Sequence, residues 1–201
     1  MKQMHGLMYG GPGSGKSSLA RNLAADRRIF PSGEAVITVH SDMARYQSPE
    51  FASDVRKDRS REDLQVGLYA GMEHAVGQAL HAGVHVLTDN MHGFRAWRDR
   101  ERGYAPSGLH LGQFVLWVVT RPEVAAQRVL TREGPGVVRY DSQEQFWDMH
   151  ACFERTSDKP DDDENVIRVD GELPYDDPDA PIDQHRQFVQ GYQDTFGEEI
   201  G

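Results

Sequence analysis

Hydrophobic positions along the chain of 201 residues alternate between short apolar runs and longer segments with helical spacing. The short runs are bounded by glycine, proline or polar residues, a pattern that predicts strands. The predicted strands cover residues 3–9, 35–40, 84–88, 113–119 and 165–169. The run at 113–119 is the most apolar, which favours a place at the centre of a parallel sheet, where both faces are buried.

The longer segments predict helices between these strands. In the clearest, apolar residues recur on one helix face between residues 61 and 81, and Ala82-Gly83 ends the pattern. That face consists of Leu64, Leu68, Met72, Val76 and Leu80. Further helices are predicted at residues 18–27, 94–102, 122–132, 142–155 and 184–196. Because strands that alternate with helices pair in parallel, we expect an α/β fold with a doubly wound sheet of about five strands flanked by helices.

The length suits one α/β domain with a small appendage. We expect a domain at residues 1–171, including a helical lid at about 121–155, and an acidic C-terminal extension at 172–201. A terminal helix in this extension would pack on the domain or on a second subunit. In the second case the protein would be a homo-oligomer. No apolar run approaches the roughly 18 residues that span a bilayer, and no secretory signal is apparent. With Cys152 as its one cysteine, the chain is expected to be cytoplasmic, without a membrane partner.

The net charge of −10 is unevenly distributed. Residues 1–150 contain 18 basic and 17 acidic side chains, whereas residues 151–201 contain 4 and 15. The acidic run at 158–164 is most simply a solvated, mobile segment. Arginine clusters around 56–61 and 95–102 would permit a polyanionic substrate without requiring one.

A complete phosphate-binding motif follows the first predicted strand and opens the first predicted helix, the context in which it is specific. The motif G-x-x-x-x-G-K-[ST] reads Gly10-Gly11-Pro12-Gly13-Ser14-Gly15-Lys16-Ser17, and Ser18 continues into the helix. Glycines let backbone N–H groups surround a phosphate, and the helix directs its positive end at the same anion. Lys16 is expected to reach the β- and γ-phosphates and Ser17 to bind Mg²⁺. The predicted cofactors are therefore ATP and Mg²⁺.

Two absences narrow the class of nucleotide-binding protein. No N-K-x-D motif for guanine occurs, and Asp89 is not followed by the D-x-x-G spacing of a switch GTPase. A compact phosphotransferase remains. In such folds ligands bind outside the carboxyl ends of the strands, so polar residues there are candidates for the site. These candidates are Asp42, Arg45, Asp89, Asn90, Arg128 and Arg132.

Each candidate has a functional and a structural interpretation. Asp42 could take the proton of an attacking hydroxyl or could cap the next helix. Arg128 and Arg132 lie on one helix face and could stabilise the transferring phosphoryl group or simply face solvent. Asp89, like Asp42, could hold Mg²⁺ through water, or it could fix a neighbouring arginine.

The order of these motifs resembles that of the polynucleotide 5′-kinase family, which includes phage end-healing kinases and bacterial RNA-repair kinases. The resemblance spans about residues 4–170 and rests on the phosphate loop, Asp42-x-x-Arg45, Asp89 after a strand and Arg128-x-x-x-Arg132-x-Gly134. It implies that Asp42 activates a 5′-hydroxyl and that Arg45 binds the acceptor's phosphate. It also implies that Asp89 supports the acceptor side and that Arg132 contacts the donor phosphates from a mobile lid.

One departure concerns the acceptor. The family usually has Asp-Thr-Asn or similar where this chain has Asp89-Asn90-Met91-His92, so the identity of the acceptor is open. We expect a kinase for the 5′-hydroxyl end of DNA or RNA. The alternatives are a kinase for a modified base in DNA, a nucleoside or another small molecule, and a non-catalytic nucleotide-binding regulator.

Overall fold

The sheet of this protein has five strands that all run parallel, in the order β2-β3-β1-β4-β5. The structure is a computed structural model that describes residues 2–31, 35–40, 62–131 and 142–200, with the backbone alone at 40 and 62–65. The strands are β1 (Gln3–Tyr9), β2 (Val36–His40), β3 (His85–Asp89), β4 (Leu111–Val119) and β5 (Val166–Asp170). The expected doubly wound α/β fold of the P-loop type is confirmed.

The predicted position of the most apolar strand is wrong by one place. β4 lies between β1 and β5, and the middle of the sheet is β1. Polarity misled the prediction because β1 contains His5 and Gly6, both of which are buried. A Cβ atom on Gly6 would lie 2.7 Å from the ring of Phe114, so glycine here reflects close packing in the core.

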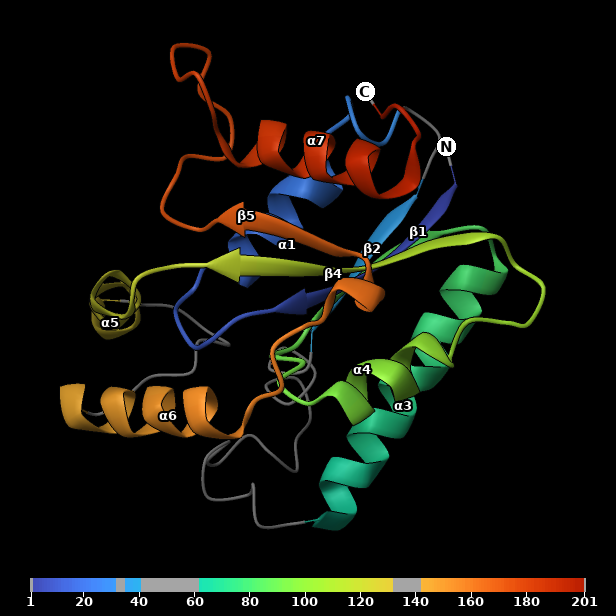
Figure 1. Cartoon of the computed structure of the whole chain (residues 1–201). Helices are drawn as coiled ribbons and strands as arrows, with labels where there is room; N and C mark the ends of the chain where they lie inside the picture. Colours follow the sequence, from blue (N-terminus) through green and yellow to red (C-terminus); the bar gives the residue numbers. More distant parts are fainter. Residues whose placement is uncertain (1, 32–34, 41–61, 132–141, 201) are drawn as a thin grey trace.

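Helices cover both faces of the sheet (Figure 1). On one face lie α1 (Lys16–Ala25) and α7 (Gln184–Phe196), whose buried side chains share one core with β1 and β4. On the other lie α3 (Glu62–His81), α4 (Arg95–Arg102) and α6 (Gln143–Thr156). α6 packs on α5 (Pro122–Thr131) through a separate small cluster around Phe146. Both helices lie at the carboxyl ends of the strands, on the left of Figure 1.

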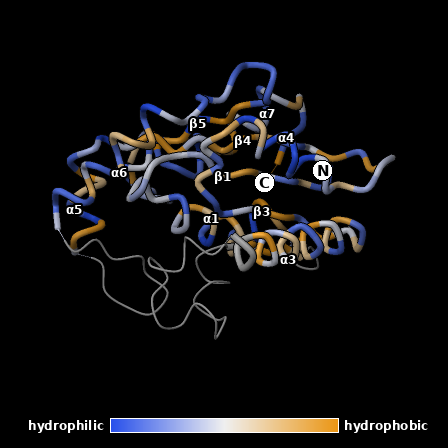
Figure 2. Tube along the Cα trace, turned by 90° about the horizontal axis from the view of Figure 1, so that it is seen from below, coloured by the Kyte–Doolittle hydropathy of each residue, from blue (hydrophilic) through white to orange (hydrophobic). Residues whose placement is uncertain are grey.

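The distribution of hydropathy matches these layers. Hydrophobic colours concentrate along the strands, whereas α3 alternates between hydrophilic and hydrophobic positions along its length (Figure 2). α7 contributes Phe188 and Tyr192, which are completely buried in the main core. The terminal helix therefore packs on the domain, and the domain boundary at 172 stays a prediction. Among the described residues, none of the helices combines the length and the apolar character needed to cross a bilayer.

Candidate phosphate-binding site

The loop between β1 and α1 has the backbone conformation that its glycines predict. Gly10, Gly13 and Gly15 have φ angles of 150°, 78° and 99°, which residues with a side chain rarely adopt. A Cβ atom on Gly13 would collide with the carbonyl oxygen of Ala125 and lie 2.7 Å from the side chain of Val129. The loop is therefore held directly against α5, and it forms a cradle that only glycine permits.

Lys16 is folded over this loop. Its Nζ donates hydrogen bonds to the carbonyl oxygens of Gly10 at 2.8 Å and Gly11 at 2.9 Å, and the residue is only 9% exposed. α1 begins here, since the backbone N–H of Leu19 donates to the carbonyl of Gly15 at 2.9 Å. The N-cap residue of α1, Gly15, has no side chain that could cap the helix, so the first N–H groups face the loop. An ammonium group, glycine backbone and a helix N-terminus are the donor set that fits a nucleotide phosphate. The Ser17 hydroxyl, on the second residue of α1, is the oxygen that would hold the accompanying Mg²⁺.

Two other loops support the phosphate loop from behind. The Thr120 hydroxyl, after β4, donates to the carbonyl of Ser14 at 2.8 Å. A Cβ atom on Gly171, after β5, would collide with Thr120 and Ser14. The next residue, Glu172, accepts hydrogen bonds from the Arg121 guanidinium, and these bonds lower the pKa of its carboxyl group. The carboxyl ends of β1, β4 and β5 thus converge at one place.

Arg128 is brought to this place by α5. Its Nη1 lies 3.5 Å from the position that a Cβ atom on Gly15 would occupy. α5 is fixed there because Ala125, Ala126 and Val129 are buried between the loop and α6. Arg128 therefore presents a positive charge beside the last glycine of the loop, where the sequence predicted a group that acts on phosphate.

The remaining predicted site residues have different outcomes. Asp42, Arg45 and Arg132 lie outside the described residues, so their roles stay predictions. Asp89 is 4% exposed at the end of β3, the strand that pairs with β1, and Asn90 follows it. Asp89 and Asn90 therefore lie at the same edge of the sheet as the phosphate loop. Within the described part of the chain no three His, Cys, Asp or Glu side chains gather as a metal site.

Sequence reasoning missed a buried pair next to Asp89. The Nε2 of His92 lies 2.6 Å from Oε2 of Glu101, and its Nδ1 lies 2.7 Å from the carbonyl oxygen of Met8. Burial opposes a charge on His92, but the charge and hydrogen bond of Glu101 raise its pKa. The same contact lowers the pKa of Glu101 against the effect of burial. In the sequence, the one signal was a histidine three positions after a strand-end aspartate.

The arginines of α4 are paired with the acidic run at 158–164. Arg98 is completely buried and forms a two-pronged ion pair with Glu164, at 2.9 and 2.7 Å. These bonds overcome the effect of burial and lower the pKa of Glu164 to about 2. Arg95 pairs with Asp161 and Asp163. The acidic run is therefore solvated as predicted at Asp161 and Asp163 but anchored at the buried Glu164, since sequence alone does not show which charges meet.

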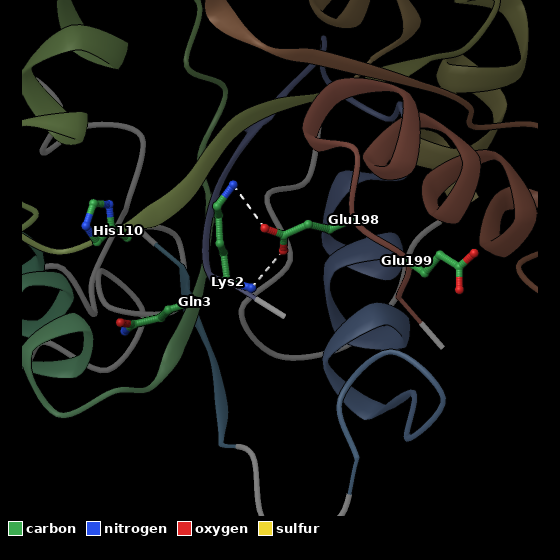
Figure 3. A pocket seen from close by; sticks show the side chains of 5 residues that line it. All are labelled: Lys2, Gln3, His110, Glu198 and Glu199. Carbon is green, nitrogen blue, oxygen red and sulfur yellow. Dashed lines mark hydrogen bonds and ion pairs between the residues drawn. The ribbon is translucent and has the colours of Figure 1, made fainter.

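A shallow pocket lies at the other end of the strands. It is lined by Lys2, Gln3, His110, Glu198 and Glu199, and Lys2 pairs with Glu198 at 3.0 Å across it (Figure 3). β1 begins at this end and enters the phosphate loop at its other end. The pocket is therefore remote from the predicted chemistry, and it holds none of the predicted site residues.

Comparisons with known proteins give one matching family and several solved structures with a similar fold. The profile of a family described as an AAA domain matches residues 6–156. No curated protein matches the chain in sequence.

Solved structures with a similar fold cover nearly the whole chain. A gluconokinase from Sinorhizobium meliloti 1021 is 20% identical, with a TM-score of 0.59, over 95% of this chain and 92% of that one. Kti12 from Chaetomium thermophilum, in complex with ADP-AlF3, is 19% identical, with a TM-score of 0.62, over 98% and 99%. An APS kinase from Mycobacterium tuberculosis, in complex with AMPPNP and APS, is 17% identical, with a TM-score of 0.57, over 96% and 99%. At these identities the likeness shows the fold.

Proposed function

The chain belongs to the AAA domain family, and from that premise we propose that it is an ATP-dependent kinase for a small-molecule alcohol. The observation that supports this most is the phosphate loop, with Lys16 folded over it and the Arg128 guanidinium beside Gly15. A loop of this kind binds nucleotide, and the second positive charge on α5 adds a group that can stabilise a transferring phosphoryl group.

Bound Mg-ATP would supply the γ-phosphoryl group and a metal ion that neutralises its charge. Lys16 would bind the phosphates and Ser17 the Mg²⁺, with Asp42 or Asp89 acting on the ion through water. In the reaction the acceptor oxygen forms a bond to the γ-phosphorus, the bond to the β–γ bridging oxygen breaks, and ADP leaves. The hydroxyl proton passes to Asp42.

The arginines at the site have separate proposed roles. Arg128 stabilises the charge on the transferring group from α5. Arg132 contacts the donor phosphates, and Arg45 binds the acceptor. A buried Asp89, with Asn90, borders the acceptor side.

The choice of a small acceptor rests on the charges around α4. A polynucleotide kinase needs a basic surface that follows the nucleic-acid backbone. The four arginines of α4 instead pair with acidic side chains, and the most buried of them, Arg98, faces Glu164. A gluconokinase and an APS kinase among the similar structures also favour a small acceptor.

The test is a labelled-ATP experiment with a panel of acceptors. The protein with Mg²⁺ and γ-labelled ATP is offered gluconate, other sugars and sugar acids, APS, nucleosides, modified-base DNA, and 5′-hydroxyl DNA and RNA strands. We expect label on a small molecule. Label on the DNA or RNA strands alone would instead establish that the protein is a polynucleotide 5′-kinase. Bound ATP with no transfer to any acceptor would support a nucleotide-binding regulator.

Two variants show whether transfer depends on the phosphate loop. Lys16→Ala should abolish transfer, because it removes the ammonium group over the loop. Lys2→Ala, which removes an exposed ammonium group at the other end of β1, should leave transfer unchanged.

A further inference from the structure

His92 has a backbone conformation that is unusual for a residue with a side chain. Its φ angle is 45°, in the left-handed region that favours glycine. The residue is 3% exposed and follows Asp89, the last residue of β3, by three positions. A strained residue of this kind persists only where the surrounding contacts hold it, and such residues concentrate at functional sites.

Three hydrogen bonds hold His92, one to β1 and two to α4. Its Nδ1 donates to the carbonyl of Met8 in β1 at 2.7 Å, and its Nε2 lies 2.6 Å from Glu101 in α4. Its own carbonyl accepts a hydrogen bond from Arg98 at 2.9 Å. Met8 lies two residues before Gly10, so the imidazole joins the strand that enters the phosphate loop to the segment that leaves β3.

The geometry also fixes the number of protons on the pair. A carbonyl oxygen can only accept, so the Nδ1 of His92 must carry a hydrogen. A contact of 2.6 Å between Nε2 and the Glu101 carboxylate requires a second hydrogen between them. The contact with Glu101 raises the pKa of His92, and the contact with His92 lowers the pKa of Glu101, so the second hydrogen lies on Nε2 and the pair is an imidazolium and a carboxylate. Such charge-assisted bonds are strong where water is excluded.

The other side of the same segment is anchored too. The carbonyl of Gly93 accepts a hydrogen bond from the backbone N–H of Asp158 at 2.7 Å. Arg98, which binds the carbonyl of His92, is itself held by Glu164. The segment from Asp89 to Gly93 is thus fastened to β1, to α4 and to the chain that enters β5.

We propose that His92 is a positioning residue for phosphoryl transfer, which fixes the segment with Asp89 and Asn90 relative to the strand that enters the phosphate loop. This inference rests on the proposed function, in which Asp89 and Asn90 border the acceptor. A displacement of about 1 Å between acceptor and donor can reduce turnover roughly 100-fold, so a rigid connection between the two sides has a direct catalytic effect.

The variant that tests this most cleanly is His92→Gly, because glycine adopts a φ of 45° without strain and loses only the imidazole. Turnover is measured as ADP release from Mg-ATP, with the acceptor found by the labelled-ATP panel or with water if none is found. We expect turnover to fall roughly 10- to 100-fold while the affinity for a fluorescent ATP analogue changes less than about threefold. Amide hydrogen exchange should become faster at residues 89–93.

A second pair of variants tests the partner of the imidazole. Glu101→Gln can still share a hydrogen bond with Nε2 of His92 and should keep most of the turnover. Glu101→Ala cannot, and it should resemble His92→Gly.

The control for a purely structural effect is Asp183→Ala. Asp183 is completely buried and caps α7, on the other face of the sheet from α4, so its loss should lower the Tm but leave turnover unchanged below the Tm. If His92→Gly keeps its turnover, or leaves hydrogen exchange at 89–93 unchanged, the positioning role is overturned while the proposed function stands. A wild-type protein that binds ATP without any turnover would overturn the proposed function, and hydrogen exchange would still decide whether His92 fixes the segment.

Discussion

At the scale of single residues, Arg128 is the side chain whose position says most about the chemistry. Its guanidinium lies beside Gly15, and the residue is only half-buried, so its removal should not disturb the fold. An arginine that stabilises a transferring phosphoryl group contributes roughly 10³-fold or more to turnover.

Arg128→Ala should therefore reduce turnover by about 10³-fold with little change in Tm, because the charge at the phosphate loop is lost. Arg128→Lys should recover only part of this, since an ammonium group lacks the planar fork of a guanidinium. Steady-state ADP release measures the effect. Arg100→Ala is the matched control, because it removes an exposed arginine that pairs with Glu73, and it should keep wild-type turnover. Equal losses in both variants would remove Arg128 from the mechanism.

His5 predicts how stability depends on pH. Burial lowers its pKa from 6.5 to about 4, so the folded protein keeps this ring neutral. The unfolded chain binds the proton more readily, and stability is therefore complete above pH 6.5 and declines as the pH falls toward 4. The shift corresponds to at most about 3 kcal/mol of unfolding free energy.

His5→Leu should reduce the loss of stability between pH 6.5 and pH 4. The Nε2 of His5 has no hydrogen-bond partner among the described residues, and Gln113 keeps its bond to the carbonyl of Arg102. An apolar side chain should therefore be tolerated. Urea unfolding between pH 4 and pH 7.5 measures the effect. If the unfolding free energy falls as steeply with pH in the variant as in the wild type, other groups cause the loss of stability at acid pH.

At the scale of elements, α7 tests whether the acidic C-terminal part belongs to the domain. Phe188 is completely buried, and its ring lies 5.9 Å from that of Phe114 in β4. Phe188→Ala should cost about 3–5 kcal/mol, because it leaves a cavity in the main core. Thermal unfolding should show one transition at a lower Tm. Gln190→Ala, at an exposed position of the same helix, should leave the Tm unchanged. Two unfolding transitions, of which Phe188→Ala shifts only one, would show that residues 172–201 unfold as a separate unit.

The elements also show what sequence could predict. The phosphate loop and α3 follow from local rules, since glycine conformation and helical spacing depend on neighbours in the chain. The buried contact of Arg98 with Glu164 joins residues 66 positions apart, and no local pattern identifies it. For the same reason β1 was not recognised as the central strand, because its Gly6 is explained only by Phe114 and Leu87 on the two neighbouring strands.

At the scale of the whole molecule, the site depends on loops that the sheet brings together. The phosphate loop, Asp89 and the loops after β4 and β5 converge because all five strands run parallel. Arg128 and the phosphate loop could be predicted as partners from the sequence, whereas the His92–Glu101 pair could not. Asp42, Arg45 and Arg132 complete the proposed site, and their roles remain predictions.

The most direct test of phosphoryl transfer to a small alcohol is a competition between two acceptor pools. ADP release from Mg-ATP is measured with a pool of small metabolites and with 5′-hydroxyl oligonucleotides, in wild type and in Lys16→Ala. We expect that only the small molecules accelerate ADP release, and only when Lys16 is present. Acceleration by the oligonucleotides alone, or equal rates in both proteins, would contradict it.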